Sequence, residues 1–199
     1  MTRISTTLRT LAFTASLSLL APLATAQAAS SHAEALARLD PLVGAFTFSG
    51  TRNEVDGSVT TLVPTRAVGE ASVNGVGRTL GFVTDAGAGA PITNRIDLSH
   101  DRFRDLYRVT VLDDASGLLD VYEGGLADGV LSVTNLRSDT FYPVGDLEVH
   151  FRLVWDLSDP VVEFTMDATT DRGAVWQPFM ATVLTPLAET APEVATNAD

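Results

Sequence analysis

The sequence predicts an all-β protein: an antiparallel up-and-down β-barrel of about ten strands with a short N-terminal helix. Residues 103 to 136 contain three runs of alternating apolar and polar residues, separated by turn sequences at 113–117 and 127–129. Asp and Gly in these turns are typical of tight hairpins, because Gly adopts positive φ without strain. Similar runs recur from residue 44 to 186. A meander with one apolar face removes its exposed edges by closing, which favours a barrel.

The first 26 residues have the features of a cleaved secretory signal peptide. Arg3 and Arg9 precede an apolar run, and Ala24-Thr25-Ala26 has the small-x-small pattern of a cleavage site. The apolar run is shorter than the roughly 20 residues that span a bilayer. We therefore expect a periplasmic or secreted protein that begins near Gln27 and has no stable membrane insertion.

Composition excludes several classes of function. The chain has 13 basic and 25 acidic residues, a net charge of -12, and no cysteine. An acidic surface repels phosphate backbones, so we expect no nucleic-acid partner. Without cysteine there are no disulfides, thiol nucleophiles, iron–sulfur clusters or Cys-ligated zinc. We expect no cofactor and no metal site.

A short helix is predicted at residues 31–40, ahead of the barrel. Ser31 and Glu34 have the spacing of a capping box, and Pro41 is expected to end the helix. Its apolar stripe indicates that it plugs or braces the barrel.

Ten strands are predicted to follow, with turns at Asp56-Gly57 and Asn74-Gly75 and a kink near Pro64. His100-Asp101-Arg102 is placed in a loop. The C-terminal residues 187–199 are expected to form a disordered tail, so the domain spans 31–186. The predicted strands are 44–52, 58–73, 78–84, 92–98, 103–112, 118–123, 130–136, 145–157, 162–168 and 174–186.

Two stretches carry a family resemblance. The residues Leu42-Val43-Gly44-Ala45-Phe46 resemble the Gly-x-Trp start of lipocalin-like barrels, with Phe46 in the position of Trp. Residues 105–124 resemble the central hairpin of a group of secreted bacterial calycin-like proteins of unknown function, which often carry a Trp where Trp176 stands. The resemblance covers roughly residues 36 to 186. It implies a lipocalin-like barrel and no particular reaction.

The candidate binding residues are aromatic side chains assigned to inward faces of the strands. Together they form either a packed core or the lining of a pocket in which Tyr and Trp supply polar tips. Arg78, Arg108 and Arg152 are candidates to pair with a ligand carboxylate. The aromatic candidates are Phe46, Phe48, Phe82, Tyr107, Tyr122, Phe151, Trp155, Phe164 and Trp176.

Two histidines, His100 and His150, are candidates for other chemistry. His150 alternates with the aromatic face of its strand, beside Glu148 and Arg152. It belongs either to an outward polar face or, alternatively, to a haem or metal site. For His100 the sequence offers no catalytic partner and no Gly-x-Ser-x-Gly nucleophile motif.

The sequence thus predicts an exported barrel that binds a small hydrophobic or amphipathic ligand, with no assigned catalytic residue. The first alternative is a non-catalytic envelope or partner-binding module with a filled barrel. Further alternatives are a haem-binding barrel and a barrel enzyme acting on a hydrophobic substrate. A pocket would favour the first function over the second, and a buried carboxylate or His inside it would favour an enzyme.

Overall fold

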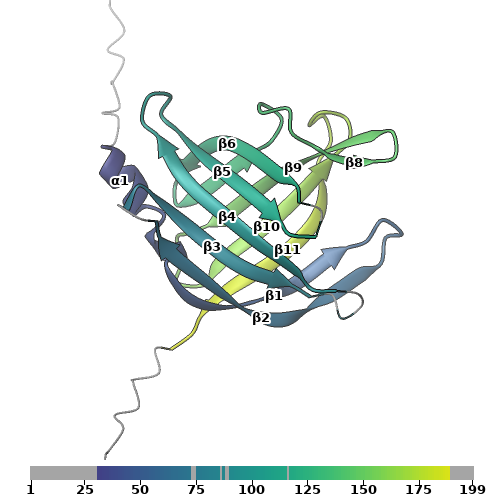
Figure 1. Cartoon of the computed structure of the whole chain (residues 1–199), viewed down its shortest axis with the longest axis horizontal. Coiled ribbons are helices and arrows are strands. Elements are labelled where there is room, and N and C mark those ends of the chain that lie inside the picture. Colours follow the sequence, from purple (N-terminus) through teal and green to yellow (C-terminus); the bar gives the residue numbers. More distant parts are fainter. Residues whose placement is uncertain (1–30, 73–74, 86, 88–89, 116, 189–199) are drawn as a thin grey trace, which may run out of the picture.

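The computed structural model describes residues 31–72, 75–85, 87, 90–115 and 117–188. It is a closed antiparallel barrel of ten strands, which confirms the predicted fold class (Figure 1). Neighbours in the ring follow the chain from β1 to β7, continue through β9, β10 and β11, and close where β11 pairs with β1. An additional strand, β8, lies outside the ring and pairs with β9. The predicted signal peptide lies outside the described residues, as does the predicted tail beyond residue 188.

The strands are β1 (Gly44–Asn53), β2 (Val59–Ala71), β3 (Gly77–Thr84), β4 (Ile92–Asp101), β5 (Leu106–Asp113), β6 (Leu119–Ala127), β7 (Val130–Thr134), β8 (Tyr142–Val144), β9 (Leu147–Asp156), β10 (Val162–Thr169) and β11 (Gln177–Pro186). The ten predicted strands all correspond to strands of the ring. The placement of His100-Asp101-Arg102 in a loop was wrong for the first two residues, because β4 continues through Asp101, which pairs with Leu106.

The β6–β7 hairpin forms as its sequence predicts. Asp128 and Gly129 both have positive φ, 51° and 82°, as the two central residues of a type I′ turn require. The strands pair directly from Ala127 and Val130 inwards. This turn fixes the register of the part of the barrel that contains the candidate site.

The predicted N-terminal helix forms in two pieces. Helix α1 spans His32–Ala37, and Ser31 and Glu34 make the predicted capping box. A 3₁₀ turn, η1, spans Asp40–Leu42 and contains Pro41. Pro41 therefore does not end the helix as expected; its fixed φ suits the first turn of a helical segment, and its missing N–H is not needed there. No helix in the described part of the chain is long and apolar enough to cross a membrane.

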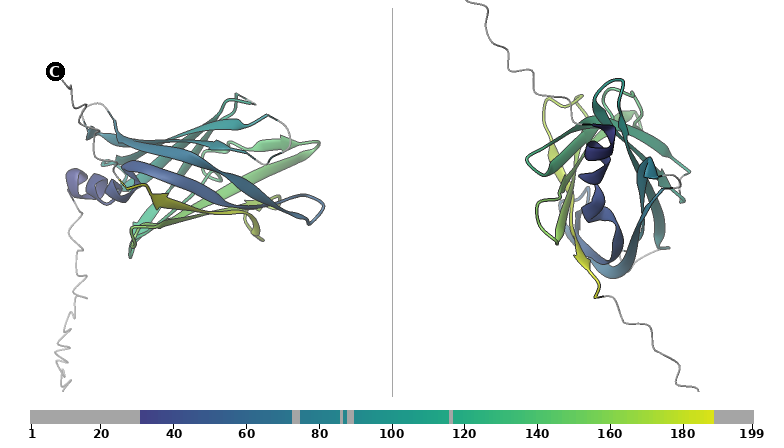
Figure 2. Two further views of the ribbon diagram at one scale, coloured as in Figure 1. Left: turned by 90° about the horizontal axis from the view of Figure 1, so that it is seen from below. Right: turned by 90° about the vertical axis from the view of Figure 1, so that its left-hand side faces the viewer.

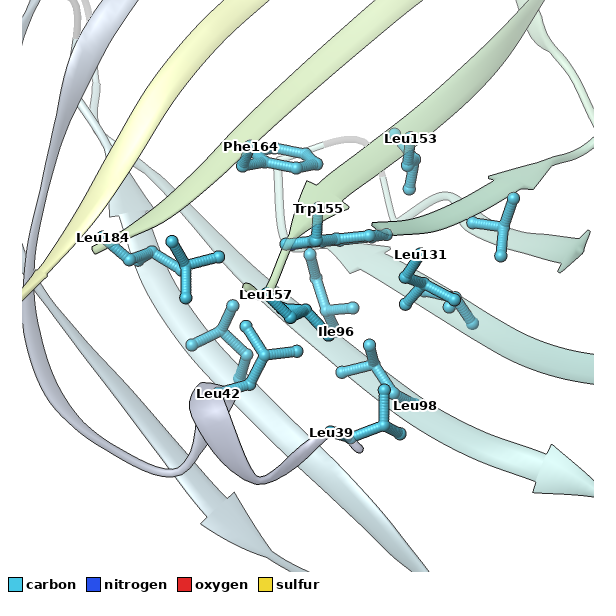
Figure 3. Close-up of a cluster of buried hydrophobic side chains, with 14 of the residues drawn as sticks. Leu39, Leu42, Ile96, Leu98, Leu131, Leu153, Trp155, Leu157, Phe164 and Leu184 are labelled. Atoms are coloured by element: carbon cyan, nitrogen blue, oxygen red, sulfur yellow. The ribbon is translucent and has the colours of Figure 1, made fainter. Parts of the chain in front are cut away.

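We call residues 32–42, which contain α1 and η1, the plug, because they lie across one end of the barrel (Figure 2). The plug buries Leu36, Leu39 and Leu42 against the barrel core. Figure 3 shows Leu39 and Leu42 among the core side chains. An ion pair reinforces this contact: the Arg78 guanidinium on β3 donates to Asp40, with its Nε 3.1 Å from Oδ1. Apolar burial and the ion pair together hold the plug across this end.

Close packing of the plug depends on a glycine in β2. A Cβ atom added at Gly69 would lie 1.6 Å from the carbonyl oxygen of Leu42, well inside van der Waals contact. Only glycine lets the 3₁₀ turn approach the strand this closely.

Candidate functional site

The fold brings nearly all of the predicted aromatic residues together. Eight of the nine belong to one buried core, and Trp176 does not. Trp155 and Phe164 stack with ring centroids 4.8 Å apart at the plugged end (Figure 3). The eight are Phe46, Phe48, Phe82, Tyr107, Tyr122, Phe151, Trp155 and Phe164.

Trp176 lies on the outer surface instead. The guanidinium carbon of Arg152 sits 4.8 Å from the centroid of a Trp176 ring. Arg152 points outward, because its strand neighbours Phe151 and Leu153 both face the core. Trp176 is therefore not placed to line the interior.

The two ends of the barrel interior differ in exposure. Most inward-facing residues near the plug are fully buried, as Trp155 and Leu184 are; Leu126 is only partly buried. At the opposite end, inward-facing Val111, Met166 and Ala168 are only half-buried. We call this end the mouth; its apolar lining is Val111, Phe151, Met166, Ala168, Phe179 and Met180.

Methionine and phenylalanine dominate the mouth. Met166 and Met180 are the only methionines after residue 1, and they face each other across the β10–β11 pair. A β-bulge follows Met166, and the Phe179 ring lies 5.6 Å from that of Phe151. Methionine has a flexible, polarizable side chain that adapts to differently shaped apolar partners.

A group of buried polar residues, the polar cluster, lies beside this apolar lining. It consists of Asp120 and Tyr122 on β6 and Asn135 just after β7, which are 3%, 1% and 0% exposed. The Tyr122 hydroxyl donates to Asp120 Oδ2 at 3.0 Å, and Asn135 Nδ2 lies 3.4 Å from the same oxygen. Asp120 Oδ1 is buried with no hydrogen-bond partner among the described residues.

The local fold explains why these residues meet. Asn135 Oδ1 accepts a hydrogen bond from the backbone N–H of Phe151 at 2.8 Å, and Asn135 N donates to the Phe151 carbonyl. The asparagine thus extends the β7–β9 ladder by one step past Thr134. Asp120 and Tyr122 share the inward face of β6, since they are two residues apart.

Burial and the neighbouring carboxylate of Asp120 keep the phenol of Tyr122 protonated. Burial, followed by the nearby Asp120, raises the pKa of Tyr122 well above its ordinary value. Tyr122 is therefore a neutral donor at physiological pH and supports the Asp120 side chain. The indole Nε1 of Trp155 is a second buried polar atom for which the described residues provide no partner.

Sequence reasoning missed Asp120 and Asn135 as site residues. The available signal was a carboxylate on the apolar face of an alternating run, two residues before Tyr122. A charged residue at such a position is rarely buried without a partner or a function.

The histidines do not face the interior of the mouth. His150 is 0% exposed on the outward side of β9, with its ring centroid 6.0 Å from that of Phe141. Neither of its ring nitrogens has a partner among the described residues. His100 contacts His32 and Asp105 next to the plug. The described residues include no group of three or more potential metal ligands.

The three arginines considered for binding a carboxylate are paired elsewhere. Arg78 holds Asp40 of the plug. On the outer faces of their strands, the other two each bind an acid on a neighbouring strand, in the pairs Arg108–Glu123 and Arg152–Asp167.

A separate hollow of about 580 Å³ lies between the plug and the β6–β7 hairpin. None of the predicted aromatic residues lines it. Its lining consists of Ala37, Arg38, Pro41, Leu126, Ala127, Asp128, Gly129 and Leu157.

Comparisons with known proteins support the fold. No protein-family model matches the sequence, and no curated protein does. Among solved structures, the chain is similar to the crystal structure of Rv2717c from M. tuberculosis, with 17% sequence identity and a TM-score of 0.56. The match covers 77% of this chain and 98% of that chain. This similarity shows a shared barrel fold.

Proposed function

We propose that this protein is an exported barrel that binds a small apolar or amphipathic molecule at its mouth. The difference between the two ends of the interior carries the proposal. At the plug most inward-facing side chains are fully buried, with Leu126 as an exception, whereas at the mouth the inward-facing Met166 stays half-buried. A ligand that covered the apolar lining would gain roughly 25 cal/mol per Å² of buried apolar surface, before the costs of association.

Binding can be tested with an uncharged apolar dye, N-phenyl-1-naphthylamine, whose emission rises in an apolar site. We expect saturable binding, weakened at least about tenfold by Met166→Asp, because the ligand would then cover an unpaired charge. Thr165→Asp is the matched control, since Thr165 is also half-buried but points to the outer face. The control should bind like the wild type.

The alternative is a filled barrel that binds a partner protein through its outer surface. Its support is the packing of eight aromatic residues into one core. Absence of saturable dye binding to the folded wild type would refute the ligand-binding proposal and favour this alternative.

Export is the second part of the proposal. Its support is the pattern of Arg3, Arg9 and Ala24-Thr25-Ala26. Amino-terminal sequencing of the mature protein should begin at or near Gln27. A mature chain that still began at Met1 would contradict export by this route.

A further inference from the structure

We infer that the polar cluster selects ligands whose head group donates hydrogen bonds, such as a primary alcohol or amine. The inference rests on the proposed function and names the class of ligand. Asp120, Tyr122 and Asn135 would bind the head group, and the mouth would bind the apolar chain.

The number of hydrogen bonds that Asp120 accepts indicates a ligand with a donor group. A carboxylate accepts about four hydrogen bonds. Asp120 Oδ2 receives one from Tyr122 at 3.0 Å and a longer contact from Asn135 at 3.4 Å, while Oδ1 receives none from the described residues. A buried oxygen without a donor is costly, and a donor supplied by a ligand removes that cost.

The position of Asp120 joins the head-group site to the mouth. Asp120 pairs across the sheet with Val111, one of the half-buried apolar residues of the mouth. Asn135 binds the backbone of Phe151, whose ring contacts Phe179. An elongated molecule with its head at Asp120 would therefore have its chain among the methionine and phenylalanine side chains.

Charge argues against a carboxylate head group. A fatty acid would place a second carboxylate beside Asp120, where like charges in a buried site repel each other. Arg78, Arg108 and Arg152 are held by other acids, as described above. At the mouth, Arg52 is the register partner of Met180, and its guanidinium is bound by Glu54 at 2.8 Å.

The test compares three ligands with the same ten-carbon chain: decan-1-ol, decylamine and decanoate. Each displaces N-phenyl-1-naphthylamine from the full mature protein at pH 7. We expect the alcohol and the amine to bind about tenfold more tightly than the acid, since each gains a hydrogen bond to a charged acceptor. Asp120→Asn should abolish this preference, with the larger loss for the amine. Asp97→Asn, on the outward face of β4, is the matched control and should keep it.

The outcomes separate the two proposals. If all three ligands bind equally to the wild type, or if decanoate binds best, the head-group inference is overturned while ligand binding stands. If none displaces the dye because the dye itself does not bind, the proposed function fails. The wild-type series decides the matter even if Asp120→Asn does not fold, which circular dichroism would reveal.

Discussion

Replacement of Trp155 by alanine tests whether the aromatic face of β9 is the structural core. The side chain is 0% exposed and stacks on Phe164 with a centroid distance of 4.8 Å. Deleting a buried Trp side chain costs about 3 to 5 kcal/mol. The indole Nε1 has no partner in the described structure. Its removal also removes the desolvation penalty of an unpaired buried donor, which offsets about 1 to 3 kcal/mol of the lost stability. The difference between the midpoints of these two ranges gives an expected loss of about 2 kcal/mol.

The free energy of unfolding would be measured by urea denaturation, followed by far-ultraviolet circular dichroism so that loss of an indole does not remove the signal. Trp176→Ala is the matched control, because Trp176 is half-buried outside the barrel under Arg152. Loss of that cation–π contact and some packing should cost about 1 kcal/mol. Equal midpoints for the two variants would refute the assignment of the core.

Two further predictions concern the plug and the polar cluster. Gly69→Ala should lower the free energy of unfolding by about 1 to 3 kcal/mol, because the added Cβ would overlap the Leu42 carbonyl. Gly81→Ala, whose Cβ would lie 3.9 Å from the carbonyl oxygen of Val68, should cost less; equal losses would contradict the close approach. The raised pKa of Tyr122 means that its stabilisation is complete below about pH 10 and declines above it, as the unfolded chain ionises first. Tyr122→Phe should therefore flatten the alkaline fall in unfolding free energy, and an unchanged slope would count against the buried phenol.

The fold could be predicted from sequence because its signals are local. Alternating runs and Asp-Gly turns report directly on strands and hairpins, as the positive φ of both Asp128 and Gly129 confirms. The capping box at Ser31 is equally local. Strand β8 was missed because its three residues are all exposed, so no alternation marks them. The end of β4 was missed because His100, a polar residue, is buried there by the plug and Tyr107.

The candidate site was harder to predict because its contacts cross between strands. The type I′ turn pairs Ala127 with Val130, and the register continues to Glu123 and Thr134. One further step places Asn135 opposite Tyr122, so the neighbourhood of these two residues follows from the hairpin. The contact of Asn135 with β9 cannot be predicted from the hairpin, because residues 135–146 separate β7 from β9 in the chain. Trp176 was misplaced for a related reason: its orientation depends on a turn that precedes β11.

The contrast between the two ends of the barrel argues that the mouth is where function lies. Three contacts hold the plug in place: its leucines are buried, Arg78 pairs with Asp40, and Gly69 allows the close approach of the 3₁₀ turn. The mouth has half-buried methionine and, next to it, a buried carboxylate oxygen with no donor among the described residues. In a barrel that only had to be filled, a carboxylate at residue 120 would add no stability, because an aliphatic side chain there would complete the core. Departures from good packing and polar satisfaction are expected at functional sites. At the mouth, half-buried apolar side chains and an unpaired carboxylate oxygen occur next to each other.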